Sequence, residues 1–142
     1  MKAVSSLNPQ IEFMNWTPVL IIGAIVVFFI VMKRSGQISA RDARLHWQQG
    51  ALVVDVRSPG EFNSGHLPAA INLPLDEITA ALPQRESDKN RVILLHCQSG
   101  LRSGLAKSKL KALGYAQVFN LGSYGRAEKI LNQSSSFPPP AK

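Results

Sequence analysis

The chain has 142 residues and a formal net charge of +7, from 16 Lys and Arg against 9 Asp and Glu. Its length suits one small domain with its own core. The single cysteine excludes an intrachain disulfide, and with only three dispersed histidines it lacks the paired spacing of a zinc site. No nucleotide-binding glycine motif is present, so we expect neither a metal nor a cofactor. Because the basic residues are scattered, their charge favours small anions or anionic lipid over nucleic acid as partner.

An apolar segment comes first along the chain. Residues 18–32 carry no charge, and extended back to Phe13 the stretch reaches about 20 residues, the length needed to cross a bilayer as a helix. Trp16 precedes the run and Lys33 and Arg34 follow it, as at membrane interfaces. A cleaved signal peptide is disfavoured because its basic residues would come first, and a buried helix would need a larger core. We therefore expect a transmembrane helix over 16–33, after a short outer tail over 1–15.

The charges that flank this segment predict its orientation. Lys33, Arg34, Arg41 and Arg44 lie close behind it, whereas only Lys2 lies before it. By the positive-inside rule, this predicts a single-pass protein of the cell (inner) membrane, with the N-terminus outside and the following domain cytoplasmic. The lipid bilayer is then an expected partner. A reducing compartment would also keep the cysteine free.

The rest of the chain alternates strands with helices. Ser39 and Asp42 have the spacing of a helix capping box, and Gly50 ends that helix after about Gln49. The further predicted elements are a strand over 51–56, a short helix over 76–82, a strand over 91–96, a helix over 103–113 and a strand over 117–121. This alternation predicts an α/β fold, an open parallel sheet flanked by helices, over 34–132. The tail over 133–142 is predicted to be disordered.

Cys97 is the most informative residue, because it joins a buried strand to a helix start. The amide groups of a helix start lack intrahelical partners and favour an anion. Arg102 adds a permanent positive charge, and Gly100 tolerates the tight turn that points the amides inward. A lone cysteine after a buried strand is usually inert. With this cradle around it, we predict instead a thiolate that attacks an anionic sulfur or phosphorus donor.

Four segments of this chain resemble one known family. The run HCQSGLRS over 96–103 resembles the active-site loop of single-domain rhodaneses. The runs DVRSPGEF over 55–62 and GHLPAAINLP over 65–74 resemble the upstream signature of that family, and 118–122 resembles its last strand. The similarity covers about residues 37–130 and implies a rhodanese-like fold. The chain departs from the family where Ser123 and Ala127 replace a frequent glycine and tryptophan.

The resemblance implies a thiosulfate sulfurtransferase of the rhodanese type, here anchored in a membrane. Cys97 would take sulfane sulfur from thiosulfate or a persulfide donor and pass it to a thiol or to cyanide. The loop residues that would bind the substrate and hold the persulfide are Gln98, Ser99, Gly100, Leu101, Arg102 and Ser103. Sequence names neither the natural donor and acceptor nor the oligomeric state.

Two other functions stay open. A phosphatase or arsenate reductase is less favoured, because related-fold phosphatases place one more residue between cysteine and arginine than the four found here. A regulatory or adaptor module at the membrane is the other alternative, although such modules often lack the cysteine.

Four further residues are predicted to be structural groups near the site. Asp55 and Arg57 follow a strand at the sheet edge where functional loops gather, and we expect them to fix those loops. Glu61 and His66 belong to the upstream signature and receive the same interpretation. His96 should face away from Cys97, because successive side chains of a strand alternate.

Overall fold

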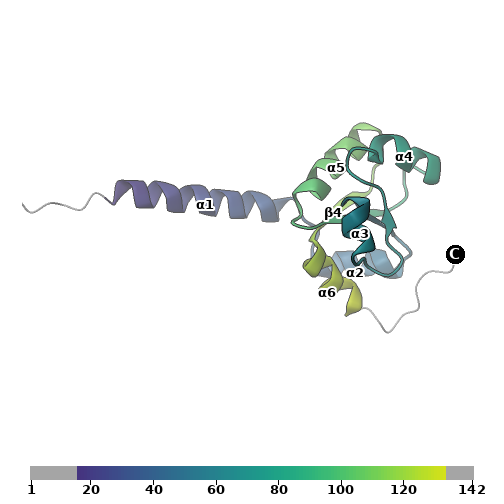
Figure 1. Ribbon diagram of the computed structural model, residues 1–142, viewed down its shortest axis with the longest axis horizontal. Helices are drawn as coiled ribbons and strands as arrows, with labels where there is room; N and C mark the ends of the chain where they lie inside the picture. The colour runs from purple at the N-terminus through teal and green to yellow at the C-terminus, as the bar shows by residue number, and fades with distance from the viewer. Residues whose placement is uncertain (1–15, 134–142) are drawn as a thin grey trace, which may run out of the picture. The chain divides into compact units, whose positions relative to one another are not determined.

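The computed structural model describes residues 16–133, and Figure 1 shows the ribbon. The chain divides into two units, Met1–Met32 and Lys33–Lys142. Helix α1 covers Thr17–Ser35, and every other element belongs to the second unit. The predicted outer tail over 1–15 lies outside the described residues. So does the predicted disordered tail over 133–142, apart from Gln133, which caps the last helix.

The predicted transmembrane helix is wrong. Within the described part of the chain, no helix is both long enough and apolar enough to cross a membrane. The uncharged part of α1 runs from Thr17 to Met32, a rise of about 24 Å against the ~30 Å of a hydrocarbon core. The placement predicted from this segment, in the cell (inner) membrane with the N-terminus outside and the domain cytoplasmic, is therefore also wrong. No spanning helix among the described residues supports the predicted bilayer partner.

The second unit is an α/β domain around a parallel sheet, as predicted. Among the described residues this sheet has four strands in the order β2-β1-β3-β4. The strands are β1 (Leu52–Asp55), β2 (Ile71–Asn72), β3 (Ile93–Cys97) and β4 (Val118–Ser123). The helices are α2 (Ala40–Gln48), α3 (Pro59–Asn63), α4 (Ile78–Arg85), α5 (Leu101–Ala112) and α6 (Tyr124–Asn132). Because all strands are parallel, their carboxyl ends meet at one edge, where the Cys97 loop lies.

Two apolar clusters bury the two faces of the sheet. Alternate residues of β3 point to opposite sides: Leu95 and Cys97 pack with α4 and α5, whereas Leu94 packs with α2 and α6. Figure 1 shows these helix pairs as two layers with β4 between them. Ala127 of α6, at the position of the family's frequent tryptophan, is fully buried in the second cluster. A small residue therefore fills this place.

Three differences from the predicted elements bear on the site. Helix α5 starts at Leu101 rather than 103, because Gly100 adopts a left-handed φ of 93° directly before it. Strand β4 extends to Ser123 across a register shift opposite Leu95 and His96. Helix α3 was not predicted, although its capping box, Ser58 with Glu61, and its first-turn Pro59 are readable signals.

Candidate active site

Cys97 is the last residue of β3 rather than a loop residue, and residues 98–100 turn the chain directly into α5. Its residue surface is fully buried, at 0% exposure. The thiol is nevertheless not enclosed by hydrocarbon alone. The Gly100 N–H donates to its sulfur at 3.1 Å, and the Ser103 hydroxyl lies 3.6 Å from the sulfur.

Two opposing influences act on the ionisation of Cys97. Burial raises the pKa of the thiol, whereas hydrogen bonds from the Ser103 amide and hydroxyl and from the Ser99 and Gly100 amides lower it. The hydrogen bonds outweigh burial, so the pKa of Cys97 lies below its ordinary value. This is the thiolate-stabilising cradle expected of a helix start with inward amides.

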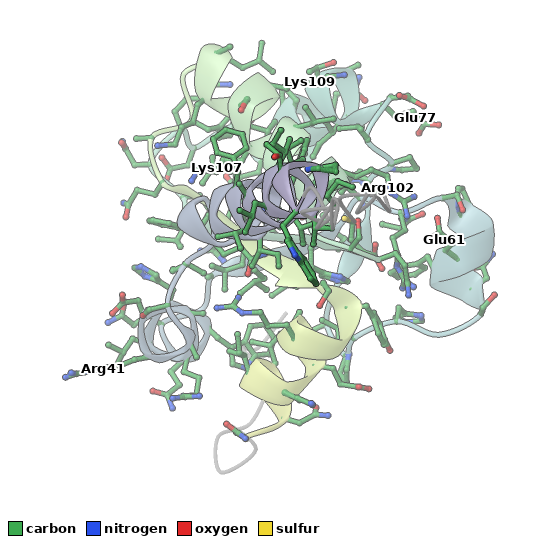
Figure 2. All side chains as sticks on the ribbon, turned by 90° about the vertical axis from the view of Figure 1, so that its left-hand side faces the viewer. Arg41, Glu61, Glu77, Arg102, Lys107 and Lys109 are labelled. Atoms are coloured by element: carbon green, nitrogen blue, oxygen red, sulfur yellow. The ribbon has the colours of Figure 1, made fainter. Side chains whose placement is uncertain are left out.

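Arg102 lies at the rim and is held by Glu61. Its two terminal nitrogens donate to the two carboxylate oxygens at 2.7 and 2.8 Å, a bidentate pair that Figure 2 shows on one side of the domain. Hydrogen bonds from Arg102, and then from the Ser58 amide, lower the pKa of Glu61 to about 2. The pKa of Arg102 is raised, chiefly by Glu61 and further by its interaction with Cys97. The guanidinium therefore stays charged, and it interacts both with the Glu61 carboxylate and with the Cys97 sulfur.

A cleft of about 290 Å³ adjoins Arg102. One side is formed by residues that follow β1, including Ser58 and Pro59, and the other by the segment that leads into α4, including Asp76 and Glu77. Because Arg102 lines this cleft, a small molecule that occupied it would lie beside the Arg102 side chain. Of the six predicted loop residues, Gly100, Arg102 and Ser103 contribute side-chain or backbone groups directed at Cys97, and Ser99 contributes its amide. Leu101 exposes its side chain, at 64%.

Asp55 and Arg57 form a buried pair next to the site rather than part of the cradle. Nη2 of Arg57 lies 2.7 Å from Oδ2 of Asp55 and donates to the Gly65 carbonyl at the same distance. The guanidinium also stacks on the Tyr124 ring, 4.6 Å from its centroid. These contacts join the segment that follows β1 to Gly65 and to Tyr124 at the start of α6.

His66 is not brought to the site. It is exposed, stacks on the Phe62 ring with centroids 3.9 Å apart, and its Nδ1 lies 3.1 Å from the Phe62 carbonyl oxygen. His96 is fully buried on the face opposite Cys97, where its Nε2 lies 3.8 Å from Asp55, too far for a hydrogen bond. Burial lowers the pKa of His96 to about 4, with Asp55 opposing and Arg57 reinforcing this effect.

Sequence reasoning missed two residues that support the loop. Asn120 of β4 reaches the Gly100 carbonyl and the Ser103 hydroxyl at 3.1 and 2.7 Å. A polar residue inside an apolar strand was the available signal. Gln37 packs against Gly122 and lies near Gly100, so closely that a Cβ on Gly122 would fall 2.9 Å from its side chain. No pattern in the sequence marks Gln37, because its role depends on a bridge to distant β4.

Comparison with known proteins points to one domain family. The model of the rhodanese-like domain family matches residues 38–125. The thiosulfate sulfurtransferase PspE of Escherichia coli is 36% identical over 77 residues, which are 54% of this chain and 68% of that protein. A sulfurtransferase of Allochromatium vinosum is 37% identical over 78 residues, 55% of this chain and 71% of that protein.

Solved structures of similar proteins share the fold of this domain. A rhodanese with anions from E. coli superposes with a TM-score of 0.52 at 34% identity, covering 54% of this chain and 89% of that one. The human single-domain sulfurtransferase TSTD1 superposes with a TM-score of 0.53 at 27% identity, covering 64% of this chain and 93% of that one.

Proposed function

We propose that this chain, which belongs to the rhodanese-like domain family, is a sulfurtransferase that carries sulfane sulfur as a persulfide on Cys97. The observation that carries the proposal is the 3.1 Å hydrogen bond from the Gly100 amide to the Cys97 sulfur, at a site where amides and a hydroxyl outweigh burial. The sulfurtransferases among its relatives support the same reaction class.

The reaction needs no external oxidant or base. The Cys97 thiolate attacks the outer sulfur of thiosulfate, the sulfur–sulfur bond of thiosulfate breaks, and its electron pair leaves with sulfite. The product is an anionic persulfide on Cys97, which the amides that held the thiolate can also hold. An acceptor thiolate or cyanide then attacks the terminal sulfur and regenerates the Cys97 thiolate. Two easier displacements replace one direct transfer.

Arg102 gives this site its preference for anions. Its forked donors can bind an oxyanion while the same charge stabilises the thiolate. Because Glu61 engages both terminal nitrogens, an incoming anion must share or displace that pair. The cleft beside Arg102 offers such an anion a place to bind.

The direct test is to incubate the full chain with thiosulfate and to record its mass and the sulfite released. We expect the wild-type chain to gain the mass of one sulfur at Cys97, and the Cys97→Ser variant to gain none. The acceptor is then identified by following labelled sulfur from Cys97. A wild-type chain that takes up no sulfur and releases no sulfite, while its thiol can still be alkylated, would refute the proposal.

One observation favours a second candidate, a binding module without catalysis: Cys97 has no exposed surface. Such a module should keep its cellular effect when Cys97 is replaced by Ser, whereas a sulfurtransferase should lose it. The same assay with a phosphate ester and with arsenate tests the phosphatase and arsenate reductase alternatives, which the four-residue spacing between Cys97 and Arg102 disfavours.

A further inference from the structure

The Cys97 loop rests on a buried side chain of β4 that carries no charge. Asn120 is 4% exposed, and its amide makes three hydrogen bonds beneath the loop. Its Nδ2 donates to the Gly100 carbonyl at 3.1 Å, and its Oδ1 accepts from the Ser103 hydroxyl at 2.7 Å and from the Gly122 amide at 2.8 Å. Every hydrogen-bonding atom of this side chain is therefore used on the cradle or on its support.

The bond to Gly100 acts on the residue that donates to the sulfur. Gly100 has a left-handed φ of 93°, and its amide lies 3.1 Å from the Cys97 sulfur. Holding the carbonyl of the same residue from below restrains its conformation and thus the direction of its amide. The support is tightly packed, because a Cβ on Gly100 would lie 3.1 Å from the Gly122 Cα.

The Ser103 hydroxyl has one proton to donate, and three acceptors lie near it. The hydroxyl oxygen of Ser103 lies 2.7 Å from Asn120 Oδ1, 3.2 Å from the Gly100 carbonyl and 3.6 Å from the Cys97 sulfur. When the sulfur is a neutral thiol, Asn120 is the nearest acceptor. When the sulfur is anionic, rotation of the hydroxyl can give the proton to the sulfur, and Asn120 Oδ1 keeps its bond from the Gly122 amide. The exchange leaves no buried acceptor unpaired.

We propose that Asn120 is a positioning residue for Cys97, which holds the Gly100 amide on the sulfur and releases the Ser103 hydroxyl to the sulfur when the sulfur carries charge. Asn120 touches neither the sulfur nor a substrate, so it acts through these two residues. The importance of Asn120 for turnover rests on the proposed sulfur transfer. Its effect on the ionisation of the Cys97 thiol does not depend on that proposal.

Because Cys97 is the only cysteine, alkylation of the full chain by iodoacetamide reports on this thiol alone. The midpoint of the rate against pH measures ionisation and, unlike the rate itself, does not depend on access. In Asn120→Asp, a carboxylate replaces the donor to Gly100 and places negative charge beside the sulfur. We expect the midpoint to rise by about one pH unit or more. Asn90→Asp makes the same charge change at an exposed position away from the loop and should leave the midpoint unchanged.

Asn120→Ala removes the three bonds without adding charge, and it keeps the test valid should the aspartate variant fail to fold. We expect a smaller rise of its midpoint, because the Gly100 amide is then held less firmly on the sulfur. The freed Ser103 hydroxyl partly offsets this rise, so the same change should raise the midpoint more in a Ser103→Ala background. Folded Asn120 variants with the wild-type midpoint would overturn the inference. If the midpoint shifts but wild-type chain takes no sulfur from thiosulfate, the proposed function fails and the positioning role stands.

Discussion

At the scale of single residues, Arg102 and Gly100 determine what surrounds the sulfur. Arg102 interacts with Glu61 and Cys97 and brings a charge that neither burial nor pH removes. Gly100 brings a backbone conformation that L side chains rarely adopt. One substitution removes each of these two contributions, and the same substitution at another position of the chain serves as its control.

Arg102→Ala should lower kcat/KM for thiosulfate by about 10- to 100-fold, because a hydrogen bond to a charged group contributes roughly 1.5–3 kcal/mol. The iodoacetamide midpoint of Cys97 should also rise, since the nearby positive charge is lost. Arg41→Ala removes the same charge from an exposed helix position and should change neither quantity. Equal effects of the two variants would show that only net charge matters.

Gly100→Ala should destabilise the domain by roughly 1–3 kcal/mol, because a left-handed conformation is strained for alanine and its Cβ meets Gly122. Urea denaturation measures this change. Gly125→Ala is the control: it lies in α6 with no atom within 4 Å of the added carbon, and should be neutral or slightly stabilising. A Gly100→Ala chain as stable as wild type would contradict the strain argument.

At the scale of elements, the short helix α3 positions Glu61. Its N-cap Ser58 accepts from the Glu61 amide at 3.3 Å, and the Glu61 carboxylate accepts from the Ser58 amide at 3.1 Å. The same carboxylate oxygen accepts from Arg102 at 2.7 Å. The capping box of α3 is thus continuous with the rim of the site.

Ser58→Ala should cost about 1 kcal/mol of stability, the usual cost of losing an N-cap. It should also lower KM for thiosulfate, because Glu61 then holds Arg102 less firmly and the incoming anion displaces it more easily. Ser39→Ala removes the equivalent cap of α2, where the Ser39 side chain accepts from the Asp42 amide, and should cost similar stability without a kinetic effect. A KM change shared by both variants would indicate that the loss of either helix cap disturbs the whole domain.

At the scale of the whole molecule, His96 makes stability depend on pH. Its pKa of about 4 in the folded domain lies below the ordinary value of 6.5, so the unfolded chain binds the proton more readily. Stability is therefore full above pH 6.5 and falls as pH is lowered towards 4. The loss should reach about 2 kcal/mol at pH 5.

Urea denaturation at pH 7.5 and pH 5 tests this expectation in the wild-type chain and in His96→Leu. Neither ring nitrogen of His96 has a hydrogen-bond partner, so leucine removes no such bond. The variant should lose most of the pH dependence over this range. If the stability of His96→Leu differs between the two pH values as much as that of the wild-type chain, other titratable groups cause the pH dependence.

Patterns between near neighbours were enough to predict most elements of the domain. The apolar run before Cys97, the turn at Gly100 and the spacing to Arg102 are local, and so are the cap at Ser39 and the stop at Gly50. From them followed the α/β class, the parallel sheet and the residues around the sulfur. Local apolarity misled at 16–33, because counting apolar residues does not give the length of the uncharged helix.

The sequence by itself therefore determined the α/β class, most of the strand and helix pattern and the choice of Cys97 as the candidate nucleophile, since each depends on residues a few positions apart. Only the tertiary structure decided which distant residues contact one another. Glu61 meets Arg102 across 41 positions and Asn120 meets Ser103 across 17. These pairs form because the order and register of the parallel strands bring distant segments to one edge of the sheet, which no local pattern encodes.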